Sequence, residues 1–514
     1  MQPLRDGEVM ALGRRLATNP DPLALYAALT DHGQRCDTML LERSVGPSLL
    51  MDQAAVRIEC RGQHVQLTAL SNGGKQILAT VARRLAERVL SFEHDRLECS
   101  FPRVVGNDPD ARLLAPSPLD VLRMLTGFAS RSAEEAFTLA LVGVVAFDHV
   151  DLFEDLPSNS GDPLGFPDYI FWLAESLIVF EPGGAPRLLC SAFGSDVAAA
   201  AERTYYDAAE RLGALIKRCA VAAPSLAPPV QSATILEPQV DLDDAAYRKV
   251  VAQLRERIAA GDIYQAVPSR TFRLACHDPL RAFAAQRMLD PSPYQFYVAA
   301  PDHILFGASP ETSVRVFDRG ALKVEVKPIA GTRPRGTTGD EDDRLEAEMR
   351  LDPKETAEHM MLVDLARNDV ARVSVSGSRR VSKLMTVERY ARVMHLVSSV
   401  TGTLRHGLDA LHALQACLNV GTLTGAPKLR ATQLLRETEA TKRGPYGGAI
   451  GWLNGEGLMD TGVVIRSAVV MDGTAHVRAG AGVVDDSDPQ READETRRKA
   501  SALLSVLALC GDQT

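Results

Sequence analysis

Hydrophobic residues recur along this chain at spacings that predict both helices and short strands. After Asp243 the spacing is helical, with apolar side chains at Tyr247, Val250, Val251, Leu254 and Ile258. Asp243 is suited to cap this helix and Gly261 to end it. Strands are predicted at Ala140–Ala146, Ile263–Val267, Ile304–Phe306, Leu322–Val326, Ala449–Trp452, Gly462–Val470 and His476–Arg478.

The order of these elements indicates the fold class. Helices and strands mix without a steady strand–helix–strand rhythm, which favours an α+β fold over a doubly wound parallel sheet. Residues 220–240 carry four prolines and few charges, as a connecting segment would. We therefore expect an N-terminal region at 1–225, a linker at 226–242 and a second domain at 243–509.

Composition narrows the range of partners. The 514 residues are 46% hydrophobic and carry a net charge of −9, which argues against a nucleic acid or an anionic membrane as partner. The chain has no apolar run of membrane-spanning length and no apolar signal segment at its start, so a cytoplasmic location is expected. The eight cysteines are scattered singly, without zinc or redox spacing, which indicates reduced thiols.

Two helices are predicted to begin with the same pattern. Each starts with Asp-Pro, at 352 and at 488, with the aspartate suited to the cap and the proline to the first turn. Two glutamates then share one helix face, Glu355 and Glu358 in the first helix, Glu492 and Glu495 in the second. Acids in a first turn can simply stabilise the helix dipole, which is one explanation of each pair.

The second explanation of the glutamate pairs is a metal site. Apolar residues follow each pair on the same side of its helix, at Leu362 and Leu365 and at Ala502 and Leu503. The carboxylates are therefore predicted to point toward a packed interior, where unpaired charges are costly. Four acids converging on one Mg²⁺ would remove that cost, because Mg²⁺ prefers a few carboxylates together with water and an anionic substrate.

Cations and glycine turns near these helices indicate an anionic ligand. Lys499 lies one helical turn after Glu495, and Arg466 lies in a predicted strand of apolar residues, where a structural ion pair is an equally good explanation. Glycine-rich turns at 421–428, 446–448 and 479–482 allow a backbone to approach an anion closely. Together with the acids, these groups predict a small polycarboxylate substrate.

At this point the motifs resemble the chorismate-utilising enzymes, and within them the enteric type of anthranilate synthase component I. The resemblance covers nearly the whole chain and is densest from Asp243 to Leu507. Its blocks are 261–270 (GDIYQAVPSR), 290–294 (DPSPY), 306–311 (FGASPE), 328–336 (PIAGTRPRG), 355–369, 393–397 (VMHLV), 424–428 (TGAPK), 479–484 (AGAGVV) and 492–496 (EADET).

The resemblance implies a fold and a set of binding residues. The fold is a large antiparallel β-sandwich surrounded by helices, with an N-terminal regulatory part. Glu358 and Glu495 would bind the Mg²⁺, and Glu355 and Glu492 would complete its acidic shell through water. The substrate-binding residues would be Arg466, Tyr446 and Lys499, which hold carboxylates of chorismate, with Thr422, Gly480 and Gly482 beside them.

The resemblance also implies the chemistry. Glu311 would be the general acid that protonates the departing C4 hydroxyl, which requires burial to raise the pKa of its carboxyl. Gln265 and Ala330 stand where related enzymes carry a water-activating or a ring-attacking lysine, which favours direct attack by ammonia. His395 would serve the loss of pyruvate, although a lone histidine among apolar residues is by itself more typical of a core.

Three functions are compatible with these residues. The first is an anthranilate synthase large subunit, a lyase that makes anthranilate and pyruvate from chorismate and ammonia, for tryptophan biosynthesis or an anthranilate-derived secondary pathway. The second is a 2-amino-2-deoxyisochorismate synthase that stops before pyruvate loss, and the third is a non-catalytic binding subunit. Because no cysteine has a glutaminase-type context, a separate glutamine amidotransferase subunit is the expected ammonia source.

The feedback pocket for tryptophan, the inhibitor expected in this family, departs from the family pattern. An arginine interrupts the N-terminal Leu-Leu-Glu-Ser motif, and other positions of the pocket carry different or bulkier side chains. We expect weak or absent tryptophan inhibition. The residues assigned to this pocket are Glu42, Arg43, Ser44, Pro293, Tyr294, Gln295, Ile450, Trp452 and Gly462.

Overall fold

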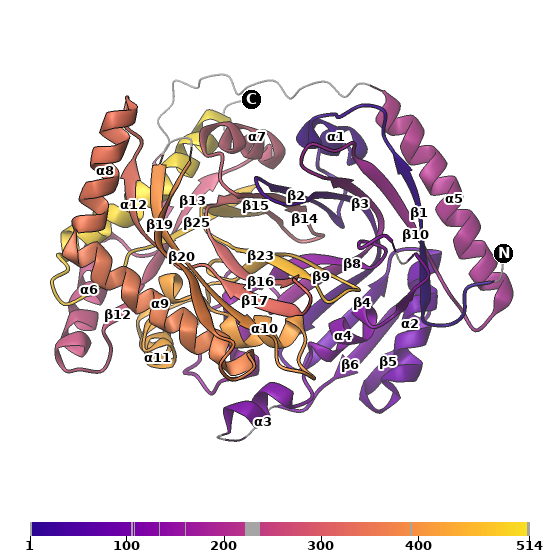
Figure 1. Ribbon diagram of the computed structural model, residues 1–514, viewed down its shortest axis with the longest axis horizontal. Coiled ribbons are helices and arrows are strands. Elements are labelled where there is room, and N and C mark those ends of the chain that lie inside the picture. Colours follow the sequence, from indigo (N-terminus) through magenta and orange to yellow (C-terminus); the bar gives the residue numbers. More distant parts are fainter. Residues whose placement is uncertain are drawn as a thin grey trace.

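A large antiparallel sheet forms the body of the protein, with helices around it (Figure 1). The computed structural model describes residues 3–103, 106, 108–132, 134–159, 161–221, 237–390 and 393–510. Of the strand pairs in the main sheet, only β1 (Glu8–Arg15) with β7 (Ala129–Ser130) is parallel among the described residues. The predicted α+β fold with a large antiparallel sheet surrounded by helices is therefore confirmed.

The N-terminal half contributes long buried strands and a few helices. Its other strands are β2 (Thr38–Arg43), β3 (Ser48–Arg61), β4 (His64–Ala69), β5 (Val89–Phe92), β6 (Arg96–Ser100), β8 (Ala140–Val145), β9 (Tyr169–Phe180) and β10 (Arg187–Phe193). Its helices are α1 (Pro22–Leu29), α2 (Asn72–Arg84), α3 (Pro109–Leu114), α4 (Asp120–Thr126) and α5 (Ala198–Ala220), with short 3-10 helices η1 (Ala86–Arg88) and η2 (Phe147–Leu152). Every residue of β9 is buried, as a strand covered on both faces requires.

The C-terminal half contributes the rest of the sheet and seven α-helices among the described residues. Its strands are β11 (Gln239–Val240), β13 (Ser269–Ala275), β14 (Tyr294–Ala299), β15 (Ile304–Ser309), β16 (Thr312–Asp318), β17 (Leu322–Val326), β18 (Ile329–Pro334), β19 (Arg380–Arg389), β20 (Val393–Thr403), β22 (Ala449–Asn454), β23 (Met459–Val463), β24 (Ser467–Met471) and β25 (Thr474–Gly480). Two short strands, β12 (Gln265–Ala266) and β21 (Gly425–Ala426), pair separately.

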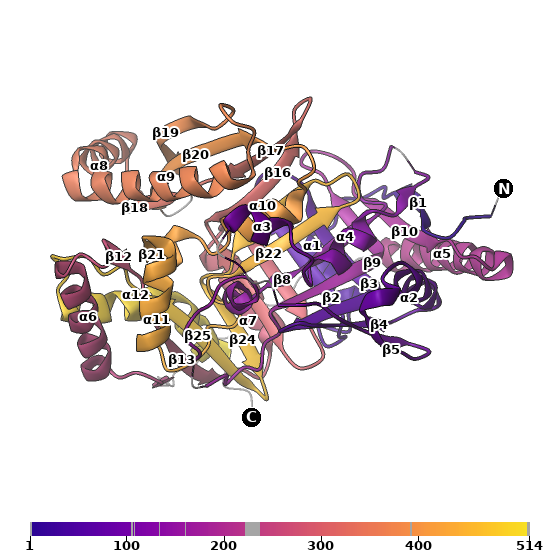
Figure 2. The same cartoon turned by 90° about the horizontal axis from the view of Figure 1, so that it is seen from below.

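Seven α-helices and one 3-10 helix are described in this half. They are α6 (Asp244–Ala259), α7 (Pro279–Leu289), α8 (Gly339–Leu351), α9 (Pro353–Val373), α10 (Ala410–Cys417), α11 (Lys428–Thr438) and α12 (Pro489–Cys510), with the 3-10 helix η3 (Gly421–Leu423). Figure 2 shows α8 and α9 on one side and α6, α11 and α12 on the other.

Hydrogen bonds join the two halves into one sheet. Strand β2 pairs with β14, so that Leu40 lies opposite Tyr297. Strand β8 pairs with β22, so that Val144 lies opposite Ile450. The N-terminal half therefore continues the sheet of the C-terminal half at two places.

The structure confirms several predicted elements and corrects two. Asp243 caps α6, and β17 has the predicted bounds. The predicted strand Gly462–Val470 is wrong, because it divides into β23 and β24 around Arg466, whose φ of 47° turns the chain. The predicted strand Ile263–Val267 shrinks to the two residues of β12.

The predicted linker is described only in part. Residues 226–236 lie outside the described residues. The end of the predicted segment is not a linker, because β11 pairs with β13, with Val240 opposite Phe272. Two residues of extended backbone gain hydrogen-bond partners there, which favours the strand over an open loop.

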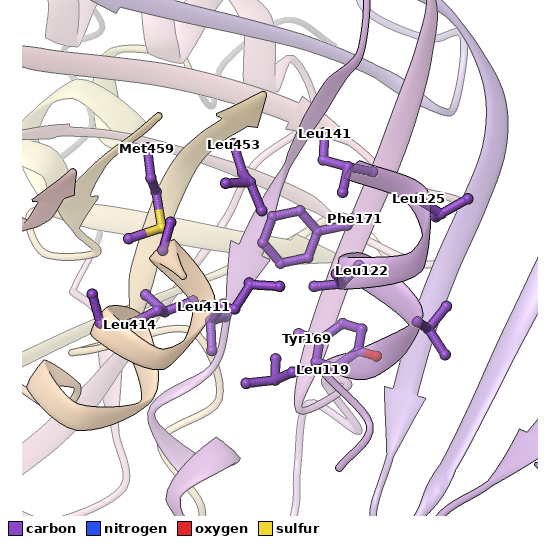
Figure 3. Close-up of a cluster of buried hydrophobic side chains, with 14 of the residues drawn as sticks. Leu119, Leu122, Leu125, Leu141, Tyr169, Phe171, Leu411, Leu414, Leu453 and Met459 are labelled. Atoms are coloured by element: carbon purple, nitrogen blue, oxygen red, sulfur yellow. The ribbon is translucent and has the colours of Figure 1, made fainter. Parts of the chain in front are cut away.

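A hydrophobic cluster packs helices from both halves against the sheet. Figure 3 shows part of it: Leu119, Leu122, Leu125, Leu141, Tyr169, Phe171, Leu411, Leu414, Leu453 and Met459. Helix α4 and helix α10 thus bury their apolar faces in one core, although 286 residues separate Arg123 and Asp409, the ion pair beside them. All eight cysteines are free, and the described helices include none long and apolar enough to cross a membrane.

Candidate active site

One cavity of about 200 Å³ brings together most of the predicted catalytic and substrate-binding residues. They come from strands, turns and helix α12, which lie far apart in the sequence. The predicted residues that line it are Glu311, Ala330, His395, Thr422, Tyr446, Arg466, Gly480 and Lys499. We call this space the reaction cavity.

Glu311 is a buried carboxyl group at the wall of the reaction cavity. It lies in the short turn between β15 and β16, and its side chain is 6% exposed. The Thr422 hydroxyl donates a hydrogen bond of 2.8 Å to Glu311 Oε1. Burial raises the pKa of Glu311 to about 7, against the opposing effects of Thr422 and Lys499. This rise in the pKa is in the direction that a general acid requires.

His395 lies on strand β20 and lines the reaction cavity. Its Nδ1 lies 2.9 Å from the Thr332 hydroxyl on the neighbouring strand β18. Burial lowers the pKa of His395 to about 4, assisted by the positive charge of Arg466, so the ring is neutral at physiological pH. Its Nε2 is buried and has no hydrogen-bond partner among the described residues. A free ring nitrogen in the cavity wall fits proton transfer better than a purely structural role.

Ala330 lies beside His395 and leaves space in the wall. It stands opposite Leu396 on β20 and is 8% exposed. A methyl group there offers neither a nucleophile nor a proton. Ala330 itself therefore cannot attack a ligand, and a nucleophile at this part of the wall has to come from a second reactant.

Three further polar side chains line the reaction cavity. Lys499 Nζ lies 2.9 Å from Glu495 and donates to the Gly480 carbonyl at 3.0 Å. Arg466 Nη1 lies 3.0 Å from Asp290, so the structural ion pair considered from the sequence exists while the same side chain lines the cavity. Burial raises the pKa of Tyr446 to about 12, which leaves its hydroxyl protonated as a donor.

Gln265 is hydrogen-bonded to one of the predicted metal ligands. Its Nε2 donates to Glu358 Oε1 at 3.2 Å, while its Oε1 is buried without a partner among the described residues. Gly482 lies against this amide, since a Cβ there would come within 2.8 Å of Gln265 Nε2. A side chain at 482 would therefore displace the amide from Glu358.

The four glutamates at the two helix starts are half-buried, not enclosed in a packed interior as predicted. Ala502, expected to follow them on an apolar side, is exposed, because that face of α12 turns to solvent. Glu355 is paired with Arg333 at 2.9 Å. Burial raises the pKa of Glu358, and the neighbouring carboxylates of Glu355 and Glu495 raise it further.

These glutamates fit a divalent cation without forming a closed site. In the part of the chain that the structure describes, no group of three or more His, Cys, Asp or Glu side chains could hold a metal ion. The raised pKa values of Glu358 and Glu492, and the partnerless oxygen of Gln265, are what a hard cation would relieve. Such an ion would complete its coordination with water and substrate, as Mg²⁺ usually does.

Two residues of the site were not identified from the sequence. Thr332 orients His395, and it lies two residues after Ala330 in the motif 328–336. Arg478 lines the reaction cavity, but its guanidinium donates hydrogen bonds to Glu439 at 3.0 Å and to Ser269 at 2.8 Å. Its position two residues before Gly480 in a strand could have indicated it, because alternate residues share a face.

The predicted effector pocket is filled by Arg43. Its guanidinium lies 3.6 Å from the centre of the Tyr294 ring and 2.5 Å from Asp460. Tyr294 also donates to Asp460 at 2.7 Å, and a Cβ at Gly462 would lie only 2.7 Å from the Tyr294 ring. The space between β2, β14 and β23 is thus occupied by the protein's own cation and carboxylate.

The remaining effector positions surround this ion pair. Glu42 binds Arg287 at 2.8 Å and stands opposite Gln295 in the β2–β14 pairing. The backbone N–H of Ser44 donates to the Pro293 carbonyl at 3.1 Å. Ile450 and Trp452 belong to the neighbouring hydrophobic core, where Trp452 packs edge-on against Phe137 at 5.1 Å.

A sheet of this size, with an acid, a neutral histidine and cations around one cavity, defines the class of protein. A family model described as chorismate binding enzyme matches residues 88–505. The chain belongs to the chorismate-binding enzyme family. The resemblance inferred from its motifs is confirmed.

Curated relatives and solved structures give the particular kind of enzyme. The chain is 44% identical over 507 residues to anthranilate synthase component 1 of Escherichia coli, covering 96% of this chain and 95% of that one. It is 45% identical over 474 residues to the pyocyanine-specific anthranilate synthase component 1 of Pseudomonas aeruginosa, covering 90% of this chain and 87% of that one. Anthranilate synthase component I from Streptococcus pneumoniae superposes with a TM-score of 0.70 at 29% identity, covering 90% and 93%.

Proposed function

We propose that this chain is the large, ammonia-using subunit of an anthranilate synthase. It converts chorismate and ammonia to anthranilate and pyruvate through 2-amino-2-deoxyisochorismate. The single observation that carries this proposal is the reaction cavity, where Glu311, Ala330 and His395 meet. Glu311 is protonated near neutral pH and Ala330 supplies no nucleophile, so the attacking group must be a second substrate.

The side chains divide the work between the two steps. Glu311 protonates the C4 hydroxyl as it leaves, while Thr422 fixes the orientation of its carboxyl group. Lys499 and Arg466 bind carboxylates of the substrate through charge-assisted hydrogen bonds. His395 Nε2, neutral and unpaired, then accepts the ring proton whose removal accompanies pyruvate loss.

Mg²⁺ fits this proposal at the two helix starts. Glu358 and Glu495 would bind it, with Glu355 and Glu492 acting through water. When bound, the ion would neutralise the charge of a substrate carboxylate. Gln265 holds Glu358 in place through its amide hydrogen bond.

The proposal includes two partners. A glutamine amidotransferase subunit supplies the ammonia, as the component number in the relatives' names suggests. Tryptophan inhibits weakly or not at all, because Arg43 and Asp460 occupy the space where it would bind.

We place the complex in the cytoplasm and assign it to tryptophan synthesis or to an anthranilate-derived secondary pathway.

The test is an assay of the purified chain with chorismate, Mg²⁺ and ammonium at alkaline pH. Anthranilate fluorescence and pyruvate are followed together, and both should appear in equal amounts. Chorismate consumed without pyruvate would instead identify a 2-amino-2-deoxyisochorismate synthase. No consumption by a folded chain would mean that the subunit only binds.

The same assay, repeated over a tryptophan titration, tests the altered effector pocket. The activity should be unchanged at tryptophan concentrations far above micromolar. Half-inhibition in the micromolar range would contradict the proposed loss of feedback.

A further inference from the structure

Arg466, which lines the reaction cavity, has a backbone conformation that residues other than glycine rarely adopt. Its φ of 47° lies in the left-handed region, and the residue lies between strands β23 and β24. An arginine gains nothing locally from this conformation, because its Cβ crowds the following carbonyl group. Such a residue persists where surrounding contacts hold it, and residues of this kind concentrate at functional sites. The contacts that hold Arg466 therefore matter for what its side chain does.

The C-terminal end of α7 holds the backbone of Arg466. The side-chain amide of Gln286 donates a hydrogen bond of 2.7 Å to the Arg466 carbonyl oxygen, and Gln286 is only 4% exposed. The backbone N–H of Ala308, in β15, donates to the same oxygen at 3.2 Å. Because the carbonyl group cannot rotate without losing both donors, two separate elements fix the left-handed backbone.

The same end of α7 holds the Arg466 side chain. Asp290 is the C-cap of α7, and its backbone N–H donates to the Gln286 carbonyl oxygen at 2.8 Å. Asp290 Oδ2 accepts a hydrogen bond of 3.0 Å from Arg466 Nη1, and Asp290 Oδ1 accepts one of 2.9 Å from the Ser292 hydroxyl. Since both carboxylate oxygens are engaged, the plane of the group is set, and with it the direction of the guanidinium.

The ion pair of Arg466 and Asp290 lies within electrostatic reach of His395. Burial lowers the pKa of His395 most, and the positive charge of Arg466 lowers it further, whereas the negative charge of Asp290 raises it. The pair therefore acts on the same space in which His395 lies. Asp290 engages Nη1, and the guanidinium has further N–H groups that can donate to a second carboxylate.

Asp290 has two opposing effects on an anionic substrate. Its negative charge repels a carboxylate, but the side chains of Arg466 and Asp290 are 35% and 26% exposed, so solvent and salt screen this repulsion. In the other direction, a long arginine side chain loses its freedom when it binds a ligand, unless the protein already holds it. We expect the orientation of Arg466 to outweigh the repulsion.

We propose that Asp290 is a positioning residue for substrate binding, which acts through Arg466 by holding its guanidinium at the reaction cavity. The inference rests on the proposed function, in which Arg466 binds a carboxylate of chorismate. It adds that the end of α7 sets the affinity for that carboxylate, although neither Asp290 nor Gln286 is among the described residues that line the reaction cavity.

The test measures KM for chorismate and kcat separately, with ammonium as the second substrate. Asp290→Ala should raise KM about tenfold and leave kcat within about twofold of the parent, because tenfold is within the range of one charge-assisted hydrogen bond. Asp290→Asn keeps an acceptor for Arg466 and should restore KM to within about threefold of the parent. Asp278→Ala removes the cap at the other end of α7 and is the matched control, with KM and kcat unchanged.

A second background identifies the route of the effect. If Asp290 acts through Arg466, adding Asp290→Ala to Arg466→Ala should change KM by less than about twofold. Where turnover is too slow to measure, the dissociation constant of chorismate replaces KM. A further tenfold rise in the double variant would mean that Asp290 acts by another route, and the proposal is then wrong. It is also wrong if Asp290→Ala and Asp290→Asn both lower KM, because the carboxylate then only repels the substrate.

The same variants separate this proposal from the proposed function. Absence of anthranilate with the unaltered chain would contradict the proposed function, and the dissociation constant of chorismate would then decide whether Asp290 orients Arg466. Should Asp290→Ala fail to fold, Ser292→Ala releases Asp290 Oδ1 and should raise KM about threefold. That rise should likewise disappear in the Arg466→Ala background, and its persistence there would overturn the proposal.

Discussion

At the scale of residues, the chemistry depends on two side chains held in unusual protonation states. Burial keeps Glu311 protonated near neutral pH and keeps His395 neutral, so one can give a proton and the other can take one. Neither state follows from the residue type. Thr422 and Thr332, each hydrogen-bonded to one of them, fix where the proton-transferring atoms lie.

Replacing Glu311 by glutamine tests its protonation in two ways. The turnover rate should fall by about 10²–10⁴-fold, because a positioned general acid contributes that much. The pKa of Glu311 is higher in the folded than in the unfolded chain, so its contribution to stability is present below its ordinary pKa of 4.5 and is lost as the pH rises through about 7. Glu311→Gln should therefore unfold at a higher temperature than the parent at about pH 8.

Thermal unfolding measured at several pH values gives the control for this prediction. The difference between Glu311→Gln and the parent should disappear as the pH falls toward 4.5, where both side chains are neutral. An equal difference at every pH would show that burial does not alter the ionisation of this carboxyl group.

At the scale of elements, the two Asp-Pro helix starts place the acidic groups. Asp352 accepts hydrogen bonds from the backbone N–H groups of Lys354 and Glu355, and Asp488 accepts from those of Gln490 and Arg491. Each cap fixes the first turn that carries a glutamate pair. Lys354, bound to Asp486 at 3.0 Å, ties the start of α9 to the segment before α12.

Removing either cap should weaken Mg²⁺ binding more than it weakens the fold. Asp352→Ala and Asp488→Ala should each cost about 1 kcal/mol of stability and raise the Mg²⁺ concentration needed for half-maximal activity. Asp278→Ala, which removes the cap of α7, is the control, with a similar cost and an unchanged Mg²⁺ requirement. Unchanged Mg²⁺ dependence in all three variants would mean that the caps do not position the metal ligands.

At the scale of the whole molecule, the two halves share one sheet and one ion pair. Arg43 and Asp460 are 417 residues apart in sequence and lie 2.5 Å from each other with 7% and 4% of their side chains exposed. The pair lies where β2, β14 and β23 meet, so it is part of the connection between the two halves.

Breaking this ion pair should destabilise the whole chain. Among the described residues, Arg43→Ala leaves the buried Asp460 with the Tyr294 hydroxyl and the more distant Arg315, at 3.7 Å, and should cost about 2–4 kcal/mol. Adding Asp460→Asn to Arg43→Ala should recover part of that loss, because the uncompensated charge is gone. Denaturant unfolding followed by fluorescence measures both, and independent unfolding of the two halves would contradict the shared sheet.

How much of this protein could be predicted from its sequence depends on the range of the interactions. Local rules predicted the cap of α6 by Asp243, the bounds of β17 and the position of Lys499 one turn after Glu495. The ordered motifs gave the family and the residues of the reaction cavity. These features depend on neighbours a few residues away or on the identity of the motif itself.

Tertiary structure decided what no local rule contains. The left-handed backbone of Arg466 interrupts a run whose apolar pattern predicts one strand, and the Arg466 side chain lines the reaction cavity at that turn. The half-exposure of the four glutamates at the two helix starts and the contacts of Arg43 with Tyr294 and Asp460 both arise from segments distant in sequence. The sequence by itself determined which chemical groups this protein has, whereas burial and long-range packing decided their charge states and what can reach them.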